Sequence, residues 1–323
     1  MPTSISLIDA MCGSGGTLAS HAGPVASGQA ADVGLVRRAN REGGEPMVKM
    51  GDVWDRTSEV LGGRGGMLAG IAILTVFVPG VINAAYTSYA PAGGLRSAIV
   101  VLLLIAVTIA SIWGQLAIIA AATDPATTRP AAQRQATERL LPALGVMLVL
   151  GIVATIAFLP AIVLLVLSHL DFAAMANGTP PASPEASGPL LLAGLYMLVA
   201  FVVLLFVGAR LLPLYAVVLR ERLGLGAIGR AWRLTRRHTW RLVGAVLLFM
   251  IVVMIASWAA QAVAGLVTAL VLGGDAVATV RFVGTVAAQA ASTALTLVAI
   301  VFSAQAYVAF VARDAMLRAR AAA

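Results

Sequence analysis

The sequence has little charge, one cysteine and three isolated histidines, and each shortage excludes a class of protein. Charged residues make up 11% of the 323 residues and hydrophobic ones 60%, far from the average of soluble globular domains. The single cysteine, Cys12, excludes an intramolecular disulfide framework and a cysteine-rich metal site. No HExxH, GxSxG or P-loop pattern occurs. We therefore expect no catalytic residue, no metal site and no cofactor, and predict that the protein is not an enzyme.

The hydrophobic residues are gathered in six long runs. About 20 helical residues cross the hydrocarbon core of a bilayer, and each run reaches that length. The runs are residues 67–86, 98–121, 143–167, 189–212, 242–266 and 284–311. The sequence therefore predicts an all-α, polytopic membrane protein with six transmembrane helices.

The distribution of basic residues predicts how these spans are oriented. The net charge is +8, and all 22 Lys and Arg except Arg96, Arg210 and Arg281 lie before span one, between spans two and three, between spans four and five, or after span six. By the positive-inside rule these segments and both termini are cytoplasmic. We thus expect anionic membrane lipids as partners of the basic segments, and no nucleic acid. A membrane or cytoplasmic protein partner is also compatible with this surface.

Composition divides the chain into two parts. Residues 1–46 are rich in Gly, Ala and Ser and contain no apolar run, which predicts a disordered cytoplasmic tail. Residues 47–323 hold the six spans and form the membrane domain. Lys49 is the only lysine, whereas Ala, Gly and Arg are abundant, which is typical of a GC-rich bacterial genome. We therefore predict a multi-pass protein of the bacterial inner membrane.

The segment from Arg220 to Leu242 contains seven arginines and predicts an amphipathic helix at the membrane surface. At helical spacing, Arg230, Arg233, Arg237 and Arg241 share one face, opposite apolar residues. Such a helix, continuing into span five, is expected to lie in the interface before it enters the bilayer. These four arginines, with Arg210, are the candidate lipid-binding residues.

An internal repeat connects this segment with the rest of the chain. Gln115, Arg210 and Gln305 are 95 residues apart in both intervals, and each is followed after 9 to 11 positions by an acidic residue. Residues 53–72 also align with residues 227–246 without a gap. We therefore predict three repeated units, each with two spans and a preceding interfacial amphipathic helix.

Arg210 is the most informative single residue, because placing an arginine within a span costs about 2.5 to 3.5 kcal/mol on insertion scales. One interpretation is that span four ends near Leu212 and that Arg210 extends its guanidinium to lipid phosphates. The other is an intramembrane polar cluster of Gln115, Arg210 and Gln305, which binds an anionic headgroup or lines a path. Both alternatives stay open at this point.

Small and amide residues suggest where spans meet. Gly62, Gly66 and Gly70 follow one another at four-residue spacing, which would let helices approach closely, and a second small-residue stripe begins at Gly284. Gln289 is expected to form a hydrogen bond between spans, as is Gln261.

The stretch from Ala209 to Leu248 resembles the membrane domain that accompanies some bacterial glycerophosphoryl diester phosphodiesterases, and related stand-alone polytopic inner-membrane proteins. The residues that match that pattern are Arg210, Pro213, Ala227, Arg230, Trp232, Leu234 and Thr235. The resemblance implies a six-span fold of repeated units with no chemistry of its own, since the phosphodiesterase activity belongs to a separate soluble domain.

These observations lead to one functional hypothesis and one alternative. We expect a non-catalytic integral membrane protein that organises or binds anionic lipid through basic cytoplasmic interfacial helices. The alternative is a transporter or permease-like protein that uses the intramembrane polar cluster. The spans lack the carboxylates that proton or sodium coupling usually needs, which disfavours the alternative.

Overall fold

The computed structural model describes residues 50–90, 94–167, 187–236, 239–273 and 276–322, and within these ranges it is all helical, with no strand. The predicted tail, residues 1–46, lies outside the described residues. The helices are α2 (Met50–Ala72), η1 (Ile73–Phe77), α3 (Val78–Tyr89), α4 (Gly94–Thr123), α5 (Arg129–Leu167), α7 (Ser187–Arg210), α8 (Leu214–Arg220), α9 (Gly226–Thr235), α10 (Thr239–Leu272) and α11 (Val277–Ala322).

Six helical stretches of the described chain are long and apolar enough to cross a membrane, which confirms the number of spans predicted. They are Met50–Tyr89, Gly94–Thr123, Arg129–Leu167, Leu190–Arg220, Thr239–Leu272 and Val277–Ala322. Most of their large apolar side chains face outward, as hydrocarbon-facing residues do. In the first stretch the π turn η1 joins α2 and α3 into one continuous helical rod.

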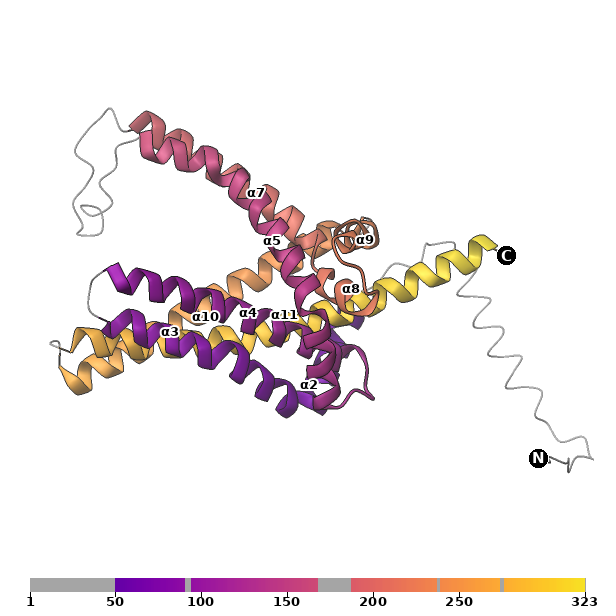
Figure 1. The fold of residues 1–323 in the computed structure, drawn as a ribbon, viewed down its shortest axis with the longest axis horizontal. Helices are drawn as coiled ribbons and strands as arrows, with labels where there is room; N and C mark the ends of the chain where they lie inside the picture. The colour runs from indigo at the N-terminus through magenta and orange to yellow at the C-terminus, as the bar shows by residue number, and fades with distance from the viewer. Residues whose placement is uncertain (1–49, 91–93, 168–186, 237–238, 274–275, 323) are drawn as a thin grey trace, which may run out of the picture. The chain divides into compact units, whose positions relative to one another are not determined.

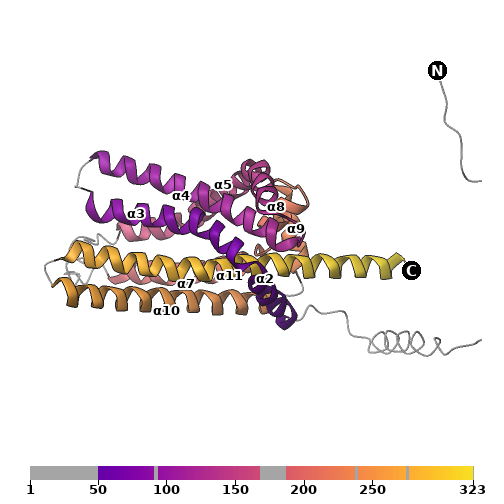
Figure 2. The same cartoon turned by 90° about the horizontal axis from the view of Figure 1, so that it is seen from below.

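The long helices are arranged as a bundle with a divergent pair. Helices α3, α4, α10 and α11 run side by side (Figures 1 and 2), whereas α5 and α7 pair with each other and lean away from the bundle (Figure 1). α11 packs along α10 and also contacts α2, α3 and α4. It therefore forms the central helix of the arrangement.

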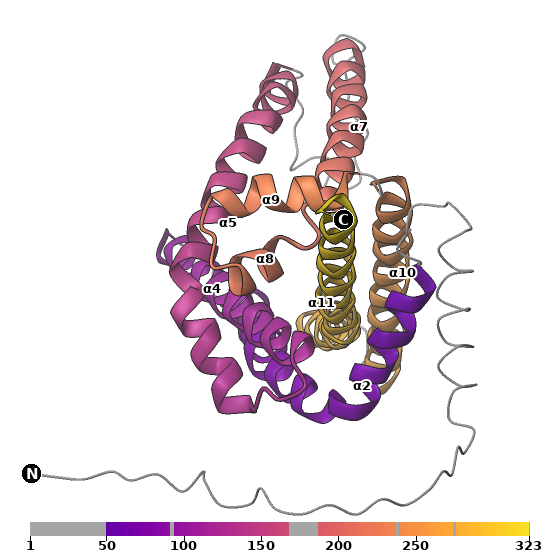
Figure 3. The same cartoon turned by 90° about the vertical axis from the view of Figure 1, so that its right-hand side faces the viewer.

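The short helices α8 and α9 lie at one end of this bundle. Figure 3 looks along α11 from the C-terminal side and shows α9 crossing the bundle end, with the start of α2 running across it as well. The α4–α5 link and the end of α11 lie at the same end (Figure 1). These are the segments that contain most of the arginines, so the described basic residues are concentrated at one end of the molecule.

Glycine spacing proved an uneven guide to helix packing. A Cβ atom on Gly62, Gly66 or Gly70 would meet nothing within 4 Å. The close helix contact that we expected at this stripe is therefore absent from the part of the chain that the structure describes. At Gly284 the expectation holds, because a Cβ there would lie 3.1 Å from the Gln261 carbonyl oxygen of α10. The difference arises because Gly62 and Gly66 lie on the exposed side of α2, whereas Gly284 is buried in α11.

Candidate functional site

Arg210 is the last residue of α7 and lies in a corner made by two aromatic rings. Its guanidinium carbon lies 4.3 Å from the ring centre of Trp232 on α9 and 5.0 Å from that of Phe206 one turn earlier. Its Nε donates a hydrogen bond to the Thr239 hydroxyl at 3.1 Å. In the part of the chain that is described, its terminal nitrogens have no hydrogen-bond partner. We call Phe206, Arg210, Trp232 and Thr239 the arginine corner.

Two threonines hold the arginine corner together. The Thr235 hydroxyl donates to the Arg210 carbonyl oxygen at 3.0 Å, which joins the end of α7 to the end of α9. The Thr239 hydroxyl, one turn further, accepts the hydrogen bond from Arg210 Nε and donates to the Thr235 carbonyl oxygen at 3.3 Å. Threonine hydroxyls commonly bond to the preceding turn, and here they fix the position where the chain changes direction.

The arginine-rich segment does not form the single helix that the spacing predicted. Arg222 has a φ of 55°, and residues 221–225 separate α8 from α9. Helix α9 ends at Thr235, and Arg241 belongs to α10. Arg237 lies outside the described residues. Arg230 and Arg233 therefore lie on α9, and Arg241 lies on a separate helix, α10.

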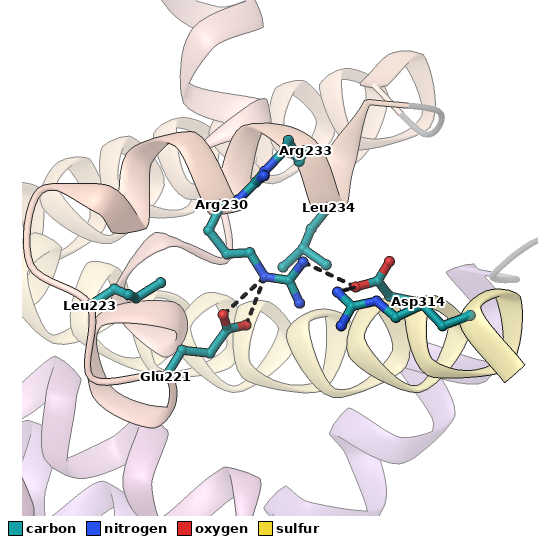
Figure 4. A pocket seen from close by; sticks show the side chains of 7 residues that line it. Glu221, Leu223, Arg230, Arg233, Leu234 and Asp314 are labelled. Atoms are coloured by element: carbon teal, nitrogen blue, oxygen red, sulfur yellow. Dashed lines mark hydrogen bonds and ion pairs between the residues drawn. The ribbon is translucent and has the colours of Figure 1, made fainter. Parts of the chain in front are cut away.

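Arg230, one of the candidate lipid-binding residues, is held in an ion-pair network that encloses most of its side chain. Its Nε lies 2.9 Å from Glu221 Oε2, and its Nη1 lies 3.0 Å from Asp314 Oδ2. Figure 4 shows the side chain reaching from α9 to a position between the two carboxylates. The Tyr307 hydroxyl donates to Glu221 at 3.5 Å, and Arg318 pairs with Asp314 at 2.7 Å. The network joins α8, α9 and α11.

The charge state of Arg230 follows from these partners. Burial lowers the pKa of its guanidinium, but hydrogen bonds to Glu221 and Asp314, and their negative charges, outweigh burial and raise the pKa above its ordinary value. Only 17% of the side chain is exposed. Arg230 therefore stays positively charged, and the carboxylates of Glu221 and Asp314 balance its charge within the protein. It borders a recess of about 520 Å³ that Arg233 and Leu223 also line.

A second polar centre surrounds the C-terminal end of α4. The buried Gln305 of α11 donates its amide to the Ala122 carbonyl oxygen at 2.7 Å. Arg220 of α8 donates to the Ala120 carbonyl oxygen at 3.1 Å and to the Thr123 hydroxyl at 2.7 Å. Arg64 of α2 reaches the carbonyl oxygens of Ala121, Asp124 and Thr127 at 3.2 to 3.3 Å.

These hydrogen bonds give partners to the last backbone carbonyl oxygens of α4. The last carbonyls of a helix have no partner within it, and the partial negative charge there favours cations. Two arginines and one amide from three different helices supply the missing donors. The α4 end is thus where α2, α8 and α11 are joined.

The residues of the predicted intramembrane cluster have separate partners. Gln305 bonds to the end of α4, whereas Arg210 bonds to Thr239 and stacks on Trp232. Gln115 is half-buried within α4, two turns before the carbonyl that Gln305 reaches. Arg210 therefore bonds to α10 and Gln305 bonds to α4. A polar cluster or path that includes all three residues stays a prediction.

Sequence reasoning missed the partners of these arginines. Trp232 and Thr235 belong to the matching pattern, and their contact with Arg210 explains why these residue types occur together. Glu221 and Asp314 follow Arg210 and Gln305 at similar spacing, and that spacing was the available signal for an ion pair. No pattern in the sequence indicates that Arg64 and Arg220 meet the same helix end.

Three arginines near the arginine corner are exposed. Arg233, Arg236 and Arg241 have no side-chain hydrogen bond or ion pair with any residue that the structure describes. The neighbouring Trp240 is 80% exposed, and its ring centre lies 6.3 Å from that of Phe206. Exposed tryptophan beside arginine is typical of the level at which lipid headgroups meet hydrocarbon.

Six apolar helices with a basic, aromatic-bordered end define a multi-pass helical membrane protein. The chain belongs to the family described as a domain of unknown function (DUF7847), which it matches over residues 56–313. Comparisons with curated proteins and with solved structures gave no match.

Proposed function

We propose that this protein binds anionic lipid headgroups at the basic end of its bundle, and that this end is cytoplasmic in a bacterial inner membrane, with both termini on that side. The observation that favours this most is the arginine corner. A guanidinium presents two terminal nitrogens to a phosphate, and those of Arg210 are free of described partners. In this proposal the protein acts by lipid binding and organisation, with no catalytic step.

The surroundings of Arg210 suit a phosphate at the membrane surface. The Trp232 ring, whose centre lies 4.3 Å from the guanidinium carbon, stabilises the cation without using its N–H donors. Arg233, Arg236 and Arg241 add positive charge without internal neutralisation. Arg230, by contrast, is neutralised by two carboxylates, so in the refined proposal it positions α9 and does not contact lipid.

The repeated architecture is also part of the proposal. Buried pairs four residues apart occur ahead of three spans: Val53 and Thr57 in α2, Ala132 and Ala136 in α5, and Ala227 and Ala231 in α9. Leu68 and Leu242, which the alignment makes equivalent, are both fully buried. We propose that these segments are three copies of one interfacial amphipathic helix, each placed before a span.

The proposed kinship with the membrane domain of glycerophosphoryl diester phosphodiesterases rests on the same residues. Arg210, Trp232 and Thr235 of the matching pattern touch one another, and Arg230 of that pattern forms the ion-pair network. A pattern whose members meet in space is more specific than one of spacing alone. The proposal is limited to a shared arrangement of these residues.

Native mass spectrometry of the full chain in detergent tests headgroup binding. We would titrate phosphatidylglycerol and phosphatidylcholine separately against the wild type and Arg210→Gln. Because charge-assisted hydrogen bonds to a phosphate contribute about 1.5 to 3 kcal/mol, the substitution should weaken phosphatidylglycerol binding about tenfold or more. Phosphatidylcholine binding should change less.

Two variants make the test specific. Arg134→Gln, at an exposed position of α5, removes the same charge away from the corner and should leave the lipid preference unchanged. Arg210→Lys keeps the charge but loses the planar stacking on Trp232, so it should bind with intermediate affinity. An Arg210→Gln protein that is folded and keeps full preference for phosphatidylglycerol would refute the proposal.

A further inference from the structure

A cavity of about 380 Å³ lies within the membrane-spanning part of the molecule, away from the arginine corner. One wall is formed by α2 and η1 from Ala69 to Phe77, and the other by α11 from Ala290 to Leu297. Its lining is almost entirely apolar. Both walls belong to the candidate spans, so the cavity lies at the depth of the hydrocarbon core.

The π turn beside this cavity ends just before a proline. Pro79 has no backbone N–H, so it cannot bond to the Thr75 carbonyl oxygen as a regular helix requires. Instead the Val78 N–H reaches back five residues to the Ile73 carbonyl oxygen. Such a turn contains an extra residue and bulges outward, and π turns within helices are frequent at functional sites.

Contacts on the other sides of the π turn hold its shape. Thr75 is buried directly against Gly114 of α4, where a Cβ atom would overlap its side chain. The Gln289 amide of α11 donates to the Val76 carbonyl oxygen at 3.4 Å, as expected for a bond between spans. The same side chain packs on Gly80. The cavity is therefore a preformed feature of the fold.

The chemistry of the lining excludes water and polar ligands. Its polar member, Thr293, already donates its hydroxyl to the Gln289 carbonyl oxygen within α11 at 2.7 Å. A bound water needs two to four polar partners, which this lining lacks. Four alanines, at positions 69, 72, 290 and 294, leave the space that larger side chains would fill.

The cavity opens toward the hydrocarbon. Ile73 lines it and is 48% exposed on the outer surface of the bundle. In a membrane that surface meets acyl chains, which are flexible and apolar and can enter from the side. We infer that the cavity is a binding site for one acyl chain of a membrane lipid, held between the π turn and α11.

Photocrosslinking of the full chain in lipid nanodiscs tests this inference. The probe is phosphatidylcholine with a diazirine at mid-chain, whose zwitterionic headgroup makes the result independent of the proposed anionic headgroup site. After illumination, mass spectrometry locates the labelled residues. Residues 69–77 and 290–297 should be labelled more strongly than residues 191–203 of α7, where most of the large apolar side chains are exposed.

A cavity-filling substitution separates a site from ordinary lipid contact. Ala294→Leu should reduce labelling of both walls about tenfold, because its added carbons displace chain methylenes that would otherwise be buried. Labelling of α7 should stay the same. Ala259→Leu, an exposed position on α10, is the matched control and should change neither signal.

Two results would contradict an acyl-chain site in this cavity. Equal labelling of the cavity walls and α7, or wall labelling that Ala294→Leu leaves intact, would overturn the inference. If Ala294→Leu fails to fold, Ala294→Val fills less space and should give a partial reduction. Loss of phosphatidylglycerol binding in the Arg210 variants has no bearing on this readout, so the two proposals can fail separately.

Discussion

Arg230 of α9 forms an ion pair with Asp314 of α11 at 3.0 Å while its Nε bonds to Glu221 at the end of α8. The guanidinium thus connects three helices through one side chain. Because the two carboxylates are only 23% and 32% exposed, neither is fully solvated without this partner. Arg230 therefore stabilises the basic end of the bundle from within.

Replacing Arg230 with Gln should destabilise the protein by about 1 to 3 kcal/mol, since it leaves the partly buried Glu221 without its counter-charge and Asp314 with Arg318 alone. Thermal unfolding in detergent, followed by circular dichroism, would measure the change. The matched control is Arg134→Gln, because Arg134 pairs with Glu138 on the surface, where the side chains are 84% and 52% exposed. That control should cost at most about 0.5 kcal/mol. Equal effects of both variants would contradict an internal role for Arg230.

Gly114→Ala and Gly66→Ala should have opposite consequences. A Cβ atom on Gly114 would overlap the Thr75 side chain, whose hydroxyl bonds to the Ile71 carbonyl oxygen at 2.9 Å. We expect a loss of about 1 to 3 kcal/mol, the usual cost of overpacking. A Cβ atom on Gly66 meets nothing within 4 Å, and alanine favours the helix, so that variant should be neutral or up to about 1 kcal/mol more stable.

The same thermal measurement distinguishes the two glycines. If Gly66→Ala lowered the stability as much as Gly114→Ala, the contact between α4 and the π turn would not be the cause. Gly114→Ala should also shift labelling in the acyl-chain cavity, because Thr75 lies in the turn that forms one wall.

Asp124 should give the stability a dependence on acid pH. Hydrogen bonds from the Ala126 N–H, at 2.9 Å, and from Thr127 hold the pKa of this carboxyl below its ordinary value, against the effect of burial and with help from the charges of Arg220 and Arg64. A lowered pKa means that the stabilisation is present above the unfolded pKa of about 3.9 and is lost as pH falls through the folded value.

Asp124→Asn is the variant that reveals this dependence. The difference in melting temperature between the wild type and Asp124→Asn should be constant from about pH 7 to 5 and should shrink below about pH 4. Unfolding followed at several pH values in a pH-insensitive detergent would show it. A difference that stays the same across the acid range would mean that the charge of Asp124 has no part in the turn.

Local patterns predicted the spans well because hydropathy depends on residues that are close in the chain. The six runs correspond to the six long helices, and the bond that Gln289 makes to α2–η1–α3 agrees with its expected role between spans. The helix over the arginine-rich segment was predicted too long. The first interruption includes Arg222, whose φ is 55°. Helix α9 ends at Thr235 and α10 begins at Thr239, and both threonines bond to Arg210, a contact that exists only once α7 is in place.

The sequence by itself determined that this is a six-span helical membrane protein with its basic residues gathered in a few segments, since span length and charge are local properties. Only the tertiary structure decided which arginines are free. Arg230 is neutralised by carboxylates from two other elements, Arg64 and Arg220 are bound to the end of α4, and Arg210 is stacked on Trp232. The physical reason is that a charge is available to a ligand only when the residues packed around it leave it unpaired, and those neighbours are distant in the chain.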